Sequence, residues 1–135
     1  MVVTLRPPVA SVDRFIAAPV ATVWQVLTDL GAWPQWGPSV RRAALSDGAT
    51  ELCLGTRGTV WTAVGVPLPF TITEFEPQSR WTWAVAGLPA TGHALTGAPG
   101  GCRARFEVPW WATAYLPVCA VALRRIEGLA GQAAQ

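Results

Sequence analysis

The stretch VATVWQVLTDLGAWPQWGPSV, residues Val20–Val40, decides the fold that we expect for this chain. Its first half repeats apolar residues at i, i+3, i+4 and i+7, namely Val20, Val23, Trp24 and Leu27. This spacing predicts a helix with one apolar face, with Pro19 at its start and Gly31 at its end. The second half, WPQW, predicts one more helical turn in which Trp33 and Trp36 share a face. We expect these two indoles to fill the core between the helices and a sheet.

On both sides of this stretch the hydrophobic pattern has a period of two, which is typical of β-strands. One strand is expected before it, at Val9–Ile16. Seven are expected after it: Val40–Leu45, Glu51–Leu54, Gly58–Val64, Phe70–Phe75, Arg80–Val85, Thr91–Thr96 and Cys102–Val108. The connections between them are short and rich in turn residues, and Gly87-Leu88-Pro89 is expected to break the chain. Short connections of this kind indicate an antiparallel meander.

A final helix is expected from Pro109 to about Leu129, and its first half is apolar on nearly every side, as in a buried helix. Pro117 lies in the middle of this range and should bend the helix. One stripe should cover a cavity, and its members are Trp111, Tyr115, Val118, Ala122 and Leu129. A second stripe either packs on the outer turns or forms a homodimer surface, and it consists of Leu116, Cys119, Leu123 and Ile126.

The composition agrees with an α+β domain that is hollow. The 135 residues make one domain, 1–135, in which 51% of residues are hydrophobic and only 13% are charged; soluble domains usually have about 25% charged residues. Eight residues are Trp. This is more apolar surface than a compact core needs. A curved sheet that wraps a long helix can leave a hydrophobic cavity between them, and the surplus can line that cavity.

Several classes of protein are disfavoured by the same counts. A net charge of +2, carried by ten arginines and no lysine, is too weak for a nucleic-acid binder and reflects a GC-rich, bacterial genome. We expect no signal peptide, because the N-terminal stretch MVVTLRPPVASVDRF has no apolar run after a charged start. We expect no transmembrane segment either, because the longest apolar run, Val108–Leu123, is short and contains a proline. Cys53, Cys102 and Cys119 form no CxxC pair, which speaks against a metal site and favours a reducing cytoplasm.

Three segments carry a resemblance to a known family. Val20–Val40, Ile72–Trp83 (ITEFEPQSRWTW) and the closing helix resemble the START-like superfamily, also called SRPBCC or Bet v 1-like. That superfamily includes polyketide cyclases and aromatases, lipid-transfer domains and plant hormone receptors. The resemblance covers nearly the whole chain and implies a helix-grip fold, in which a curved antiparallel sheet wraps around a long C-terminal helix above a deep hydrophobic pocket. It does not fix one activity.

The candidate catalytic residues are His93, Tyr115 and Glu74. His93, the only histidine, shares strand parity with Leu95 and could act as an acid or base in the pocket or donate a hydrogen bond to a ligand carbonyl. The alternative places it at the rim or the surface. Glu74 could point inward as a base, although the opposite face of its strand, with Phe75, is an equally good inner face. Tyr115, the only tyrosine, is a candidate donor to a ligand oxygen.

Aromatic residues supply most of the expected ligand contacts. Trp81 and Trp83 alternate with small or polar neighbours, so both indoles should face inward, where they either stack on a flat ligand or fill the core. Phe106 belongs to the inner face of the last strand, and Trp61 lies near the open end of the meander. The full expected set is Trp61, Trp81, Trp83, Phe106, Trp111, Tyr115 and Val118.

Two functions follow from this sequence. The first is binding of a hydrophobic small molecule, such as a lipid, polyketide or aromatic metabolite, without a cofactor. The alternative is an enzyme of the polyketide cyclase, aromatase or dehydratase kind that acts in the same cavity. Aromatase-type cyclases of the superfamily resemble one another in an arginine on a central pocket strand, and Phe70–Phe75 has none. That difference favours binding.

Overall fold

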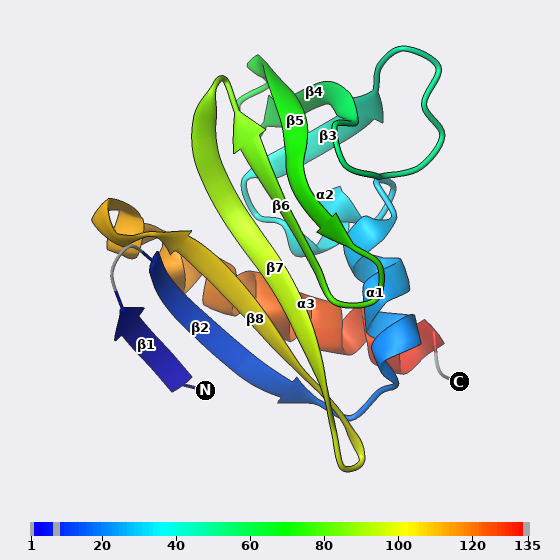
Figure 1. Cartoon of the computed structure of the whole chain (residues 1–135), viewed down its shortest axis with the longest axis vertical. Coiled ribbons are helices and arrows are strands. Elements are labelled where there is room, and N and C mark those ends of the chain that lie inside the picture. Colours follow the sequence, from blue (N-terminus) through cyan, green and yellow to red (C-terminus); the bar gives the residue numbers. More distant parts are fainter. Residues whose placement is uncertain (1, 7–8, 134–135) are drawn as a thin grey trace.

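The computed structural model describes residues 2–6 and 9–133, which form an eight-stranded antiparallel sheet with the helices against one face (Figure 1). The strands are β1 (Val2–Arg6), β2 (Val9–Ile16), β3 (Val40–Leu45), β4 (Arg57–Thr62), β5 (Pro67–Glu76), β6 (Arg80–Val85), β7 (Leu88–Ala98) and β8 (Gly101–Pro109). The helices are α1 (Val20–Thr28), α2 (Trp33–Trp36), the 3₁₀ helix η1 (Trp110–Tyr115) and α3 (Leu116–Ala133). The architecture is therefore the α+β helix-grip arrangement that the sequence predicts.

The strand order is β1-β2-β8-β7-β6-β5-β4-β3. Strands β3 to β8 follow one another as antiparallel neighbours, which confirms the meander. Strand β2 joins this meander at β8, where Val9 pairs with Pro109 and Ile16 with Cys102. Strand β1, which extends the sheet beyond β2, was not predicted from the sequence. Helix α3 crosses behind β2 and β8 and also packs against α1 and α2 (Figure 1).

The joint between α1 and α2 is closed by the two indoles of α2. Trp33 Nε1 donates a hydrogen bond to the carbonyl oxygen of Leu27 (2.9 Å), and Trp36 Nε1 donates to that of Val26 (3.1 Å). Those carbonyls belong to the last turn of α1, where the helix supplies no backbone N–H to accept from. Both indoles are buried. Trp33 and Trp36 therefore fill the core, as expected, and also fix the direction in which the chain leaves α1.

The break expected at Gly87-Leu88-Pro89 is only a tight turn. Ala86 and Gly87 have φ angles of 52° and 79°, which is the positive-φ pair of a two-residue hairpin turn. Strand β7 then begins immediately at Leu88 and is longer than predicted.

The strand expected at Glu51–Leu54 is wrong, because this segment is part of the loop between β3 and β4. The backbone N–H of Cys53 donates to the side-chain oxygen of Thr56 (3.0 Å) instead of to a neighbouring strand. Gly55 follows with a φ of 84°, a conformation that ends an extended run. Leu52 is buried and anchors the loop to the core.

The C-terminal helix differs from the expectation in its first turns. Pro109 ends β8, the next six residues form η1, and the α-helix starts only at Leu116. Pro117 therefore lies in the first turn of α3, where a missing N–H costs nothing, and it does not bend the helix from the middle. Because residues 110–115 form a 3₁₀ helix and not the first turns of α3, the residues of the closing segment that line the cavity described below come from η1.

The second stripe of this segment is buried within the chain. Leu116, Cys119, Leu123 and Ile126 are between 0% and 8% exposed, because α3 turns them toward the sheet and α1. The stripe is thus part of the core, and it cannot be the homodimer surface that the sequence left open. Trp111, by contrast, belongs to the stripe that was expected to cover the cavity, and it is 59% exposed to solvent.

We predict that Gly101→Ala destabilises the fold, whereas Gly97→Ala does not. A Cβ on Gly101 would collide with the backbone of Ile16 and Ala17, which has no flexible end to move aside, whereas one on Gly97 meets nothing. Urea unfolding should show a loss of about 1–3 kcal/mol for the first variant and a change within about 0.5 kcal/mol for the second. Equal unfolding midpoints would contradict the close approach of β8 to the end of β2.

Candidate functional site

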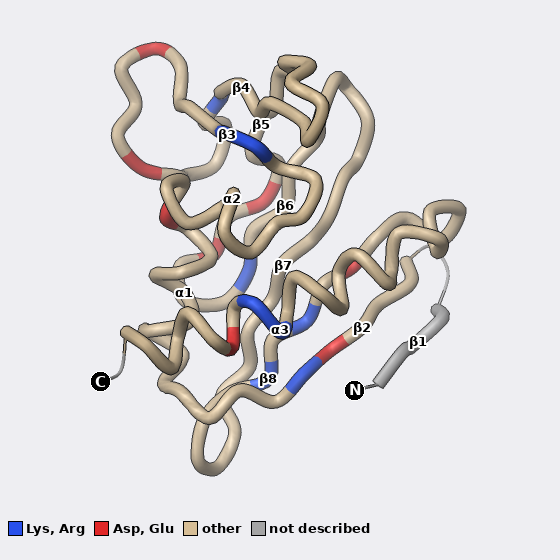
Figure 2. Tube along the Cα trace, turned by 180° about the vertical axis from the view of Figure 1, so that it is seen from behind, with Lys and Arg blue, Asp and Glu red and all other residues tan. Residues whose placement is uncertain are grey.

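An apolar cavity, which we call the main cavity, lies between η1 and the strands β4 to β8 and has a volume of about 480 Å³. Two other hollows, of about 560 and 600 Å³, have linings that include charged side chains. The wall of the main cavity is apolar apart from a few hydroxyl groups and the indoles of two tryptophans. Among the described residues no charged side chain lines it. The lining residues include Val60, Leu68, Trp83, Val85, Val108 and Tyr115. Figure 2 shows the charged residues on the strands, the loops and the later turns of α3, while the end of the molecule formed by η1 carries none.

A second, much smaller chamber of about 40 Å³ lies deeper, toward α2 and α3. Five residues line both spaces and so form the wall between them: Ser39, Val40, Trp83, Thr91 and Tyr115. The inner chamber has room for little more than one water molecule. Its other sides are formed mainly by aromatic rings and by α3.

A stack of three rings closes the inner end of the site. The indoles of Trp33 and Trp81 are stacked, with an angle of 8° between their planes and 5.2 Å between their centroids. The imidazole of His93 continues the stack on Trp81 at 3.9 Å, and Phe106 meets that imidazole edge-on at 4.6 Å. Through this aromatic stack, Trp33–Trp81–His93, α2 packs directly on the sheet, and the main cavity lies on the η1 side of it.

The hydrogen bonds of His93 define its protonation. Nδ1 lies 3.2 Å from the carbonyl oxygen of Trp81, which can only accept, so Nδ1 carries the hydrogen. Nε2 lies 3.1 Å from the hydroxyl of Thr91, and that hydroxyl oxygen also accepts from Trp83 Nε1 at 2.9 Å. The consistent arrangement runs from the Trp83 indole to Thr91, from the Thr91 O–H to Nε2, and from Nδ1–H to the Trp81 carbonyl. Both ring nitrogens are therefore committed inside the protein.

Burial lowers the pKa of His93 to about 3, because the imidazolium would lose its hydration; the hydrogen bond to the Trp81 carbonyl opposes this, and the charge of Arg80 adds to it. The side chain is 1% exposed. His93 is therefore inward-facing, as one of the two sequence interpretations had it, and neutral at physiological pH.

Tyr115 and Ser39 form the other polar element of the wall. Their hydroxyls share a hydrogen bond that joins η1 to the loop before β3. Burial raises the pKa of Tyr115, with a smaller opposing effect from Ser39. The phenol is therefore protonated at neutral pH and can donate.

The expected ligand contacts divide into three groups. Trp83, Trp111 and Tyr115 line the main cavity. Trp81, Phe106 and Val118 line only the inner chamber. Trp61 lines neither, because alternation along β4 turns Val60 inward and Trp61 outward, where it packs under the guanidinium of Arg42 at 4.5 Å. Trp61 is thus not part of either wall, and its expected role as a ligand contact at the pocket entrance stays a prediction.

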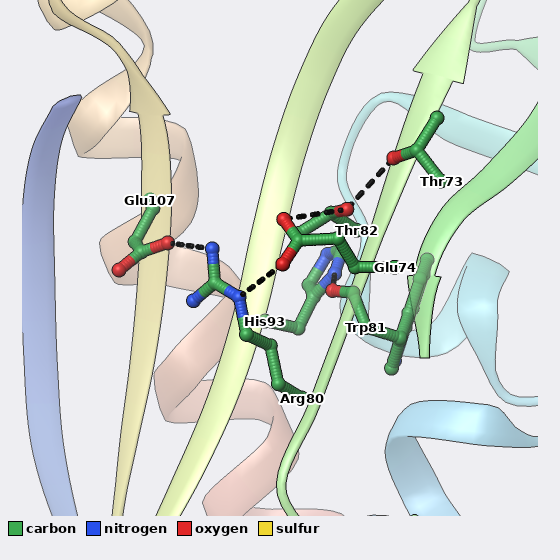
Figure 3. A network of polar contacts seen from close by, with 7 residues as sticks. All are labelled: Thr73, Glu74, Arg80, Trp81, Thr82, His93 and Glu107. Atoms are coloured by element: carbon green, nitrogen blue, oxygen red, sulfur yellow. Dashed lines mark hydrogen bonds and ion pairs between the residues drawn. The ribbon is translucent and has the colours of Figure 1, made fainter. Parts of the chain in front are cut away.

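Glu74 lies on the outer face of the sheet, away from the cavity (Figure 3). Arg80 lies between two carboxylates there, 2.6 Å from Glu107 and 3.4 Å from Glu74, and Thr82 donates to Glu74 at 3.3 Å. The Glu74 side chain is 56% exposed. Glu74 has the same strand parity as the buried Phe70 and Ile72, but a register shift between Ile72 and Glu74 turns it to the opposite face of the sheet. The interpretation that Glu74 points inward is therefore wrong.

Two residues of the wall were not identified as functional from the sequence. Ser39 follows the WPQW turn directly, but a lone serine in a loop carries no pattern that points to a cavity. Thr91 lies two residues before His93 on β7, so both side chains point to the same face of the sheet. This strand parity was the one signal in the sequence that could have placed Thr91 in the wall. Within residues 2–6 and 9–133 no group of three His, Cys, Asp or Glu side chains is arranged to hold a metal ion.

Comparison with known proteins places the chain in a family. The sequence profile described as polyketide cyclase / dehydrase and lipid transport matches residues 8–134, and the chain belongs to this family. No curated protein matches in sequence. In the part of the chain that the structure covers, no helix has the length and apolar character to cross a membrane.

Solved structures share the fold. Protein Ms6760 from Mycobacterium smegmatis has a TM-score of 0.71 at 20% identity, over 98% of each chain. Protein MLL2253 from Mesorhizobium loti has a TM-score of 0.72 at 18% identity, over 92% of this chain and 97% of that one. The AHSA1-like protein from Aeromonas hydrophila has a TM-score of 0.65 at 14% identity, over 93% and 94%. At these identities the likeness shows the fold alone.

The protonation of His93 makes a prediction about acid stability. The unfolded chain takes up a proton at this residue below pH 6.5, whereas the folded chain does so only near pH 3. The contribution of His93 is thus complete above pH 6.5 and is lost as the pH falls. Between pH 7 and pH 5 the free energy of unfolding of the wild type should fall by about 2 kcal/mol more than that of His93→Gln, which cannot titrate.

Urea unfolding at several pH values measures this difference, and the matched variant removes the contribution of the carboxylates. Parallel curves for the two proteins would show that the pKa of His93 is the same in the folded and the unfolded chain, which contradicts its burial and its two hydrogen bonds.

Proposed function

We propose that this member of the polyketide cyclase / dehydrase and lipid transport family binds an apolar small molecule in the main cavity. The observation that carries the proposal is an uncharged, almost entirely apolar wall around a space of about 480 Å³. Binding sites for small molecules commonly have volumes of about 300–1,000 Å³ and combine apolar walls with a few polar groups. The family description is consistent with such a ligand.

The mouth of the cavity supports the same proposal. Val64 and Trp111 line the cavity and are also 82% and 59% exposed to solvent. An apolar ligand that reaches the mouth would cover part of this surface, and each Å² of apolar area removed from water contributes about 25 cal/mol. Exposed apolar side chains at the mouth, Val64 and Trp111, therefore favour binding over an empty cavity.

Catalysis of the cyclase or dehydratase kind has weaker support. It needs a group that can exchange a proton with the ligand. Both nitrogens of His93 are already bonded, and its neutral form leaves no acid at physiological pH. Glu74 is on the opposite face of the sheet. Tyr115 alone reaches the main cavity, and its raised pKa suits hydrogen bonding better than proton release.

We also propose a cytoplasmic location. All three cysteines, Cys53, Cys102 and Cys119, are free thiols, as expected in a reducing compartment. Cys102 and Cys119 are buried, where they act as small apolar side chains.

Val85→Trp should weaken binding at least tenfold while the protein stays folded. Val85 lines the cavity and is only partly buried, so a larger side chain extends into empty space rather than into the packed core. Titration with the neutral dye Nile red, whose fluorescence rises in apolar surroundings, should saturate with the wild type and show at least tenfold weaker binding with this variant.

Ala84→Trp is the matched control, because Ala84 is adjacent on β6 and its side chain points to the other face of the sheet. It should bind like the wild type. The proposal fails if the wild type shows no saturable signal, or if both variants bind equally well.

A further inference from the structure

We propose that the ligand is uncharged and places a carbonyl-type oxygen against the wall formed by Ser39, Tyr115 and Thr91. This inference rests on the proposed function and names the chemical class of ligand that the cavity selects. Anionic lipids and fatty acids, whose polar end is a charged group, are excluded by it. Three observations carry the proposal.

The first observation is a count of hydroxyl hydrogens in that wall. Thr91 donates its hydrogen to His93 and accepts from Trp83, so it has no hydrogen left for a ligand. Ser39 and Tyr115 have two hydroxyl hydrogens between them, and their shared hydrogen bond uses one. One hydrogen therefore remains at the boundary between the two spaces, and it needs an acceptor.

The second observation concerns Trp81, which is 0% exposed and lines the inner chamber. Its Nε1 is, among the described residues, the one buried side-chain nitrogen or oxygen atom without a hydrogen-bond partner. A buried N–H that is left unpaired costs about 1–3 kcal/mol. This end of the site thus has a second unsatisfied donor. Both unsatisfied groups need acceptors, and the inner chamber has room for one water molecule or one ligand oxygen.

The third observation is the lack of any charge to pair with an anion. No arginine, aspartate or glutamate lines either space among the described residues, and His93 is neutral. Arg80, the cation nearest in sequence to this part of the sheet, is bound to Glu107 and Glu74 on the outer face (Figure 3). A buried carboxylate would accept hydrogen bonds from these neutral donors, but it would lose its hydration without gaining an opposite charge, and for an ion that loss is much the larger. The wall therefore accepts an oxygen only when it is neutral.

Three molecules of nearly equal shape test the proposal: 2-acetylnaphthalene, 2-naphthoate and 2-isopropenylnaphthalene. The first offers a neutral carbonyl oxygen, the second a charged carboxylate at pH 7, and the third no oxygen at all. Calorimetric titration of the wild type should show the ketone binding more than tenfold more tightly than the carboxylate. A carboxylate that binds as tightly as the ketone overturns the proposal.

The double variant Ser39→Ala, Tyr115→Phe removes both hydroxyls and keeps the aromatic ring. It should lower the affinity of the ketone relative to the alkene by about three- to tenfold, which is the value of one neutral hydrogen bond. Because the ketone and the alkene have nearly the same shape, the ratio of their affinities is unaffected by a change in cavity shape that weakens both equally. Thr59→Val is the control, since Thr59 is on β4 beside the cavity-lining Val60 but faces the other side of the sheet.

The outcomes separate this inference from the proposed function. If all three molecules bind, and the ratio of ketone to alkene affinity is the same in the double variant and the wild type, the cavity binds apolar molecules but the polar anchor is wrong. If none of the three binds while Nile red does, the inference also fails. If neither they nor Nile red bind, both proposals fail.

Discussion

The stack of Trp33, Trp81 and His93 is the interaction on which the rest of the structure depends. It connects α2 to the middle of the sheet, because Trp33 packs on Trp81 at 5.2 Å and Trp81 packs on His93 of the adjacent strand β7 at 3.9 Å. Trp33 is held at the same time by the last turn of α1. The stack therefore sets how closely α2 approaches the strands at this point. It also marks the boundary between the packed core and the main cavity.

Beyond the stack the geometry changes. The chain leaves β8 through η1, a 3₁₀ segment that places Trp111 and Tyr115 over the sheet without filling the space beneath them. The wall between the solid and hollow parts holds nearly all the polar groups of the site. In this way a single boundary separates an aromatic core from an apolar cavity, and the hydrogen bonds of Thr91 and Tyr115 are gathered where the two meet.

Much of this could be predicted from the sequence, because it depends on local periodicity. The helix stripe of Val20–Leu27, the WPQW turn and the alternation of β6 and β8 gave the fold and the inner faces. Features that depend on the register between distant strands could not be predicted in this way. A register shift in β5 put Glu74 outside, and the 3₁₀ geometry of η1 moved Pro117 to a helix start. The neutral state of His93 needed its burial and partners, which no linear pattern shows.

The central claim is that the molecule is solid at the stack and hollow beside η1. The most direct measurement is the set of eight indole N–H resonances in a ¹H–¹⁵N NMR spectrum, recorded while 2-acetylnaphthalene is added. The account predicts large, saturable shifts for Trp83 and Trp111, which line the main cavity, and clearly smaller shifts for Trp33 and Trp36, which line only the inner chamber and whose N–H groups are bonded to α1. Shifts of equal size at all four indoles, or none at Trp83 and Trp111, would contradict it.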